Sequence, residues 1–181
     1  MGRAKALLTL HGQTLLARTL ATAGAADLEP VLVVPPGDNP VAAEAARLGA
    51  RVVSVGDPSD GMSASIRAGI EALSADPAVD GVLILLADQW RLAPADLQRL
   101  AEAWRQSPSG LAAAFYAGGA GVPAVFGRAW FPVLMRLTGD RGARDILRCA
   151  HPPAALVHVA AAEADIDTPT DLAAAKTEQC E

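Results

Sequence analysis

One stretch of the sequence is apolar at every position: Gly81-Val82-Leu83-Ile84-Leu85-Leu86-Ala87, with Asp88 and Gln89 directly after it. A strand with one face in water alternates apolar and polar residues, and this stretch shows no such alternation. Strands of that composition have both faces covered, as in the middle of a parallel sheet that carries helices on its two sides. The stretch therefore predicts a buried central strand that ends at an acidic residue.

Patterns typical of strands and of helices alternate on both sides of this stretch. Valine-rich segments predict short strands over residues 31–34 and 51–55. Helical spacing of apolar residues predicts helices over residues 14–25, 40–48, 62–73 and 94–105. The last third predicts a strand, turn and strand over 111–127, helices over 130–137 and 143–149, a strand over 155–160 and a helix over 169–176. This alternation predicts one domain over residues 1–181, of the α/β class, with a doubly wound, mainly parallel sheet and helices on both faces.

The composition excludes several classes of partner. The net charge is −5, which leaves neither a basic arm for nucleic acid nor a polybasic patch for a membrane surface. No apolar run approaches the about 20 residues of a membrane-spanning helix, and no signal peptide precedes the fold. Cys149 and Cys180 fit no metal-ligand spacing and are expected to be free thiols. We therefore expect a cytoplasmic protein that binds neither nucleic acid nor membrane.

Asp88 is the sharpest candidate for chemistry. Ligands of doubly wound sheets bind beyond the carboxyl ends of the strands, so the carboxylate of Asp88 should lie on the rim of the ligand crevice. A hard oxygen at that place suits Mg²⁺ in a phosphoryl or nucleotidyl transfer. An aspartate at a strand end can equally cap a turn or the next helix. Both interpretations stay open at this point.

A second acidic segment reads Asp165-Ile166-Asp167-Thr168-Pro169 and leads into the last predicted helix. Asp167 and Thr168 are both good N-cap residues, and Pro169 suits a first helical turn. Alternatively, a carboxylate from this segment meets Asp88 at one crevice, where the two would share a divalent ion. Only one of Asp165 and Asp167 is expected to face that crevice.

Three further segments carry groups that suit an anionic ligand. Residues 61–65, Gly-Met-Ser-Ala-Ser, begin a helix whose free N–H groups favour an anion, and Arg67 could face the same ligand from the next turn. Arg3 and Lys5 precede the first apolar run, as a solvated tail or as ligand contacts. Residues 139–144, Gly-Asp-Arg-Gly-Ala-Arg, either contact a second ligand or cap a helix.

Taken together, these segments resemble the MobA-like NTP transferases, and within them the molybdenum cofactor cytidylyltransferase type. The resemblance rests on five motifs in order: GRAKALL (2–8), GMSASIRAG (61–69), LADQ (86–89), GDRGAR (139–144) and DIDTP (165–169). It implies a Rossmann-like nucleotidyltransferase that transfers CMP from CTP to a phosphorylated, molybdopterin-type acceptor and releases pyrophosphate. It also implies Mg²⁺ as cofactor, a role in molybdenum cofactor biosynthesis and a molybdoenzyme as a possible partner.

The resemblance assigns roles to individual residues. It implies that Lys5 contacts the nucleotide phosphates and that Asp88 is the principal Mg²⁺ ligand, with Asp167 rather than Asp165 as its partner. Lys5 and Asp88 are therefore the expected catalytic residues. The residues expected to bind the nucleotide are Arg3, Lys5, Gly61, Met62, Ser63 and Ser65. The pair Asp88-Gln89 resembles the cytidylyl branch more than the guanylyl branch.

The sequence departs from the family pattern at three places. The family begins with a strand and a loop of the form LAAGxSxRMG, of which only Met1-Gly2 stands here, so we expect the first strand and the phosphate loop to be missing. Either the natural chain then begins roughly 15 residues earlier, or another segment fills the gap. Val122 and Trp90 replace a histidine and a proline that are usual near the acceptor. The alternative function is therefore a non-catalytic module that binds nucleotide or cofactor with the same fold.

Overall fold

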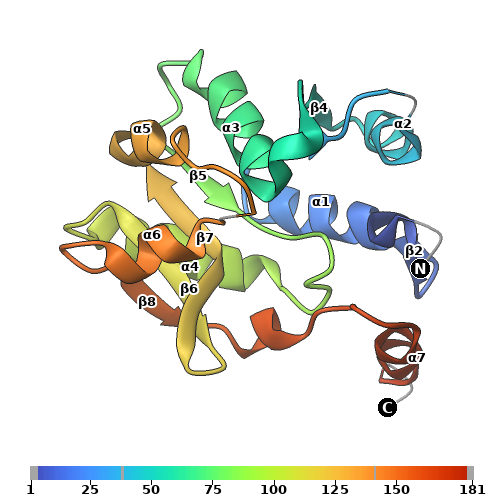
Figure 1. Cartoon of the computed structure of the whole chain (residues 1–181). Helices are drawn as coiled ribbons and strands as arrows, with labels where there is room; N and C mark the ends of the chain where they lie inside the picture. Colours follow the sequence, from blue (N-terminus) through green and yellow to red (C-terminus); the bar gives the residue numbers. More distant parts are fainter. Residues whose placement is uncertain (1–3, 38, 141, 179–181) are drawn as a thin grey trace.

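Strands and helices alternate along the chain in the computed structural model, which describes residues 4–37, 39–140 and 142–178 (Figure 1). The first half contains η1 (Lys5–Leu7), β1 (Thr9–Leu10), β2 (Gln13–Thr14), α1 (Leu15–Ala25), β3 (Val31–Val34), α2 (Pro40–Arg47), β4 (Arg51–Ser54), η2 (Pro58–Asp60), α3 (Gly61–Ser74) and β5 (Gly81–Ile84). The second half contains α4 (Pro94–Gln106), β6 (Leu111–Tyr116), β7 (Gly119–Gly127), η3 (Arg128–Trp130), α5 (Phe131–Leu134), α6 (Arg144–Cys149), β8 (Ala155–His158), η4 (Ala160–Glu163) and α7 (Pro169–Thr177). The elements labelled η are 3₁₀ helices. The predicted elements are present; β5 is shorter than expected, and the helix predicted over 130–137 is divided between η3 and α5.

Local sequence explains where two of the early helices begin. The hydroxyl of Thr14 accepts a hydrogen bond from the N–H of Ala17 at 3.1 Å and caps α1. The side chain of Asn39 accepts from the N–H of Val41 at 2.9 Å and caps α2, whose first residue is Pro40. Both are the side-chain types that satisfy free N–H groups at a helix start.

The largest sheet has the strand order β5-β7-β6-β8. β7 is antiparallel to both β5 and β6, and β6 is parallel to β8. β5, β6 and β8 therefore share one direction and β7 alone opposes them, which confirms the expected mainly parallel sheet.

The expectation of one continuous sheet needs correction. β3 and β4 form a separate parallel pair, β1 and β2 form an antiparallel pair, and no ladder joins these pairs to β5 within the described residues. The division between β3 and β5 falls where the strand order of this fold class places its first strand. β1 and β2 pair only with each other there, so neither fills that position.

Helix α3 connects the two parallel parts of the fold by packing. A Cβ at Gly69 would lie 3.2 Å from a methyl group of Val33 on β3, so glycine allows the helix to approach closely. The next residue, Ile70, belongs to the same buried cluster as Val82 on β5. Burial of apolar side chains therefore connects the β3–β4 pair to the sheet that contains β5, although no hydrogen-bond ladder joins them within the described residues.

β5 is an edge strand of its sheet, whereas the sequence predicted a central strand. Its two faces are both covered, as expected: Val82 packs into the cluster that contains Ile70 of α3, and Leu83 packs into clusters that contain Leu97 and Leu100 of α4. An unbroken apolar run indicates that both faces of a strand are buried, but it does not indicate which strands pair with its two edges. This is why β5 was wrongly expected to be a central strand. None of the helices in the described parts of the chain has the length and apolarity to cross a membrane.

Candidate active site

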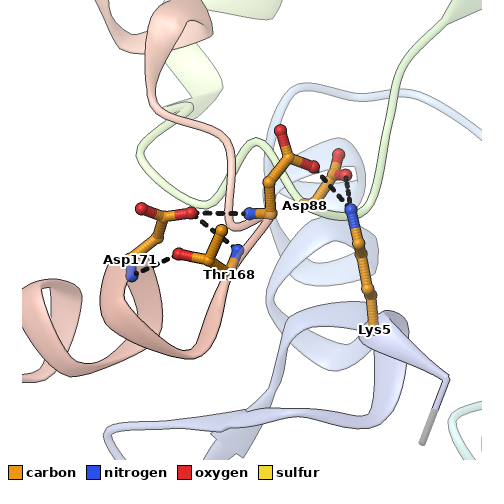
Figure 2. Close-up of polar contacts among 5 residues, drawn as sticks. Lys5, Asp88, Thr168 and Asp171 are labelled. Carbon is orange, nitrogen blue, oxygen red and sulfur yellow. Dashed lines mark hydrogen bonds and ion pairs between the residues drawn. The ribbon is translucent and has the colours of Figure 1, made fainter. Parts of the chain in front are cut away.

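Three charged side chains from distant parts of the chain meet beside α1. The ammonium nitrogen of Lys5, on η1, lies 2.5 Å from Oδ1 of Asp167 and 3.9 Å from Oδ2 of Asp88 (Figure 2). Asp88 follows β5, and Asp167 lies two residues before the first residue of α7. The structure therefore brings together the three residues for which the resemblance implied phosphate and metal contacts.

Backbone hydrogen bonds hold the two acidic segments against each other. The carbonyl oxygen of Asp88 accepts from the N–H groups of Trp90 at 2.9 Å and Ile166 at 3.3 Å, and Gln89 forms an isolated antiparallel bridge with Asp165. Ile166 is fully buried, so it anchors the segment between its two aspartates. The relative position of Asp88 and Asp167 is thus fixed by the main chain and not only by Lys5.

The open question of which residue caps α7 is settled by its hydrogen bonds. The hydroxyl of Thr168 accepts from the N–H of Asp171 at 3.2 Å, and Asp171 in turn accepts from the N–H groups of Thr168 and Asp167 at 2.7 and 3.0 Å (Figure 2). These bonds lower the pKa of Asp171. Thr168 is therefore the cap, and the carboxylate of Asp167 is left to face Lys5.

Asp88 combines partial burial with an unsatisfied oxygen. Its side chain is 22% exposed, and Oδ1 is buried without a hydrogen-bond partner among the described residues. A buried carboxylate oxygen without a donor or a cation costs free energy. The residue therefore suits a hard cation at this oxygen.

Asp165 lies in the same electrostatic neighbourhood as Asp88 and Asp167, although only one aspartate of its segment was expected to face the site. Desolvation raises the pKa of Asp165 to about 6, the negative charges of Asp88 and Asp167 contribute to this rise, and the cations Lys5 and Arg144 act in the opposite direction. Residues two apart in an extended segment point to the same side, and this periodicity was available from the sequence.

Lys5 acts as the cation of this acidic cluster. The hydrogen bond that Lys5 donates to Asp167 raises the pKa of Lys5 against a smaller effect of desolvation, so its amine stays protonated at neutral pH. Among the described residues, no group of three or more aspartate, glutamate, histidine or cysteine side chains is arranged to hold a metal ion. The oxygen donors of Asp88 and Asp167 fit a divalent cation chemically, but Lys5 now contacts both of them.

The start of α3 is held in a strained backbone conformation that requires glycine. Gly61 has φ +61°, and a Cβ there would lie 2.1 Å from Oδ1 of Asp140. The carbonyl of Gly139 accepts a hydrogen bond from the N–H of Ser63 at 3.1 Å, and the N–H of Gly139 donates to Oδ1 of Asp60 at 2.7 Å. The 139–140 turn therefore packs directly on the helix start.

Ser63 and Arg67 are occupied with this packing, contrary to the expectation that they face a ligand. Ser63 is 0% exposed; its hydroxyl donates to the carbonyl of Asp60 at 2.8 Å and accepts from Arg67 at 3.1 Å. The guanidinium of Arg67 also lies 2.7 Å from Oδ2 of Asp60 and donates to the carbonyl of Leu137. Their polar atoms are buried or paired because they join α3 to the following loop.

The remaining predicted contacts divide into two groups. Met62 is 53% exposed and Ser65 is half-buried, so both remain available to a ligand at the start of α3, beside Gly61. Arg3 lies outside the described residues.

Gln89 has a structural role that the sequence did not reveal. It is 2% exposed, and its amide nitrogen donates to the carbonyls of Val122 and Ala162, each at 2.9 Å. It thereby ties the turn after β5 to β7 and η4. A glutamine that follows a buried strand gives no sign of its inward orientation, because the same residue at a strand end can as well face solvent.

Comparison with known proteins identifies a family and related folds. The family described as MobA-like NTP transferase domain matches residues 1–159. No curated protein matches the sequence significantly.

Solved structures of three proteins illustrate the likeness of fold. The crystal structure of Rv0371c from Mycobacterium tuberculosis H37Rv is 29% identical, with a TM-score of 0.82 over 97% of this chain and 90% of that chain. Its complex with manganese aligns at 30% identity and a TM-score of 0.75, over 96% and 92%. Molybdopterin-guanine dinucleotide biosynthesis protein A from Archaeoglobus fulgidus is 17% identical, with a TM-score of 0.69 over 97% and 90%. The 2-C-methyl-D-erythritol 4-phosphate cytidylyltransferase from Thermus thermophilus is 24% identical, with a TM-score of 0.69 over 95% and 92%.

Proposed function

The chain belongs to the MobA-like NTP transferase family and is a nucleotidyltransferase, and we propose that it transfers CMP from CTP to a small phosphorylated acceptor of the molybdopterin type. In this reaction an acceptor phosphate oxygen bonds to the α-phosphorus of CTP. The bond from that phosphorus to the bridging oxygen breaks, and its electron pair leaves with pyrophosphate. We propose that the reaction takes place in the cytoplasm, in one domain over residues 1–181, and that a molybdoenzyme receives the product.

The single observation that carries this proposal is the position of Lys5 between Asp88 and Asp167. Transfer to a phosphorus atom needs charge neutralisation and in-line positioning more than a protein base. In the proposed reaction the ammonium of Lys5 neutralises the nucleotide phosphates. Asp88 and Asp167 would hold the divalent ion, which would supply further neutralisation when it is bound.

The proposed metal is Mg²⁺. The unsatisfied buried oxygen of Asp88 and the carboxylate of Asp167 are hard donors of the kind that Mg²⁺ prefers. The neighbour that was crystallised with manganese supports a divalent ion in this fold. For both aspartates to bind the ion, Lys5 must leave the oxygen of Asp167 that it now contacts.

The choice of CTP rests on the likeness of Asp88-Gln89 to the cytidylyl branch and on a cytidylyltransferase among the structural neighbours. Gln89 would act indirectly, because its amide nitrogen is bound to two main-chain carbonyls. Contact with the base then falls to the exposed start of α3, where Met62 and the backbone of Gly61 are accessible candidates.

The test is a direct comparison of nucleotides. Binding of CTP, GTP, ATP and UTP is measured by isothermal titration calorimetry with Mg²⁺ and with Mn²⁺, and pyrophosphate release is followed after addition of a molybdopterin-type acceptor. CTP should bind most tightly and should be the only nucleotide that yields pyrophosphate with the acceptor. Tighter binding of GTP would refute the choice of nucleotide, and release only with another phosphorylated acceptor would refute the pterin.

A non-catalytic module with the same fold is the second candidate. The observation in its favour is that the ammonium of Lys5 pairs with Asp88 and Asp167, the two proposed metal ligands. This candidate predicts nucleotide binding without pyrophosphate release for every acceptor and metal in the same experiment. Turnover with any of them would exclude it.

A further inference from the structure

A groove of about 390 Å³ lies between α1 and the segment that leads from Trp90 into α4. Its polar lining consists of Gln13, Arg18, Thr22 and Arg91, and no carboxylate of the described residues lines it. The volume is in the range of small-molecule sites in proteins. Lys5 and the acidic cluster do not contribute to its walls, so the groove is separate from the candidate active site.

The two arginines of this groove are held in place by one aromatic residue. Arg18 donates from Nε to the carbonyl of Trp90 at 2.8 Å, and its guanidinium carbon lies 5.9 Å from the centre of the Trp90 ring. The guanidinium carbon of Arg91 lies 5.0 Å from the same centre. Trp90 is buried, so it provides a rigid base on which both cations are oriented in advance.

The charges of the two arginines are unequally balanced. Arg91 forms an ion pair with Glu178, just beyond α7, whereas no carboxylate of the described residues lies within salt-bridge distance of Arg18. The chain as a whole is acidic, so a local pair of cations is not a consequence of composition. Because both arginines line the same groove, an anion bound there would be attracted by two positive charges.

We propose that this groove binds a small phosphorylated molecule through its phosphate oxygens. Arg18 and Arg91 are the charged contacts, because a guanidinium fork matches an oxyanion with two parallel hydrogen bonds. Thr22 and Gln13 supply neutral hydrogen bonds from the α1 side. A phosphate group is favoured over a carboxylate because two separate guanidinium forks match the larger number of oxygens on phosphate or diphosphate. Glu178 now binds Arg91 as an internal carboxylate that the ligand would displace.

The site does not depend on nucleotidyl transfer, but it connects to the candidate active site through one turn of the chain. Arg18 binds the carbonyl of Trp90, and the N–H of Trp90 donates to the carbonyl of Asp88. An anion that draws Arg18 and Arg91 together therefore acts on the turn that carries Asp88.

The experiment is calorimetric titration of the full chain with inorganic pyrophosphate and with inorganic phosphate, in the absence of divalent metal. We expect saturable binding that Arg18→Gln and Arg91→Gln each weaken at least about tenfold. Glu178→Gln should strengthen binding several-fold, because it releases Arg91 from its internal partner. The tighter binding of Glu178→Gln tests the proposal even if Arg18→Gln fails to fold, because Glu178 is exposed and its substitution should not disturb the fold.

Two control variants separate the groove from other cationic surfaces. Arg105→Gln removes one exposed positive charge that is paired with Glu102 on α4, and it should bind pyrophosphate like the parent. Lys5→Met removes the phosphate contact proposed for the candidate active site, and in that background Arg18→Gln should weaken pyrophosphate binding as strongly as it does in the parent. The proposal is overturned if Lys5→Met loses binding and Arg18→Gln does not, if Arg105→Gln loses as much as Arg91→Gln, or if no binding is detected. Tighter binding of succinate than of pyrophosphate would overturn the assignment to phosphate.

Discussion

The ammonium of Lys5 lies 2.5 Å from the carboxylate of Asp167 although 162 residues separate them in the sequence. The contact joins the first turn of the described chain to the start of the last helix. It places a cation where the proposed reaction needs a divalent ion, between Asp167 and Asp88. Lys5 and the metal should therefore compete for the same oxygens in the absence of nucleotide.

This competition can be measured through Lys5→Met. Loss of the ammonium frees Asp167 and removes a repulsive charge, so the variant should bind Mn²⁺ several-fold more tightly than the parent when no nucleotide is present. Pyrophosphate release should fall at least about a hundredfold, because the nucleotide phosphates lose their cation. Electron paramagnetic resonance of free Mn²⁺ reports the affinity separately from activity. Weaker metal binding in the variant would contradict the competition.

Asp88→Asn tests the metal site from the other side. The variant should fold like the parent, because the hydrogen bonds of Asp88 to Trp90 and Ile166 are made by its backbone carbonyl. It should lose metal-dependent CTP binding, since its buried oxygen no longer carries charge. Asp80→Asn, at an exposed position before β5, is the matched control and should bind Mg·CTP normally. Unchanged affinity of Asp88→Asn for Mg·CTP would mean that the residue holds no metal.

Much of the fold follows from sequence periodicity, because burial dictates it. The strand over 31–34 and the long helices have the expected positions, and Thr14 and Asn39 cap helices by a local mechanism. The lateral neighbours of β5 could not be predicted in the same way. Partner strands are chosen by long-range packing, to which a uniformly apolar run gives no clue.

The candidate site could be predicted only in part for a similar reason. Lys5, Asp88 and Asp167 were expected together, and the structure brings them together. Ser63 and Arg67 were expected to face a ligand, but the side of a helix start that packs on another loop depends on residues far along the chain, such as Gly139. Serine and arginine side chains are equally suited to binding a ligand and to forming hydrogen bonds inside the protein, so their presence in the sequence does not distinguish the two roles.

The pH dependence of stability should report on Asp165. Its pKa rises from 3.8 to about 6 in the folded state, so folding favours the protonated form. The contribution of Asp165 to the stability of the parent should therefore fall as the pH rises from about 4 to about 6, and the loss should persist above that range. Asp165→Asn, which cannot ionise, should be equally stable at pH 3.5 and more stable at pH 7, by a modest amount because Asp165 is exposed to solvent screening. Chemical denaturation without metal at both pH values measures the difference. A variant less stable than the parent at pH 7 would show that the charge of Asp165 is favourable in the fold.

Arg67→Met should destabilise the protein and loosen the 137–140 segment. The substitution leaves Asp60, Ser63 and the carbonyl of Leu137 without their common donor, at a cost of about 1–3 kcal/mol. Hydrogen exchange should rise at Gly139 and in the first turn of α3. Arg105→Met, which breaks only an exposed pair, should change the free energy of unfolding by less than about 0.5 kcal/mol. Equal effects of the two variants would show that Arg67 has no special role in this junction.

Gly61→Ala tests the close packing of α3 on the 139–140 turn. Gly61 has φ +61°, which by itself costs an alanine about 1–2 kcal/mol. The added Cβ would also lie 2.1 Å from Oδ1 of Asp140, so the total loss of stability should exceed that amount. Gly118→Ala is the matched control, since Gly118 has φ +75° and open space around its Cβ position. Its loss should therefore reflect the backbone alone.

The contact with Asp140 can be isolated with a double variant. Asp140→Ala removes the carboxylate that the new methyl group would meet, so Gly61→Ala should cost less in that background, by about 0.5–3 kcal/mol. The remaining cost should approach that of Gly118→Ala, with some excess because the main-chain carbon of Gly139 lies 3.2 Å from the same Cβ position. Denaturant unfolding of the four proteins gives the coupling energy directly. A coupling of zero would mean that the turn moves aside freely, and that the start of α3 is not held by it.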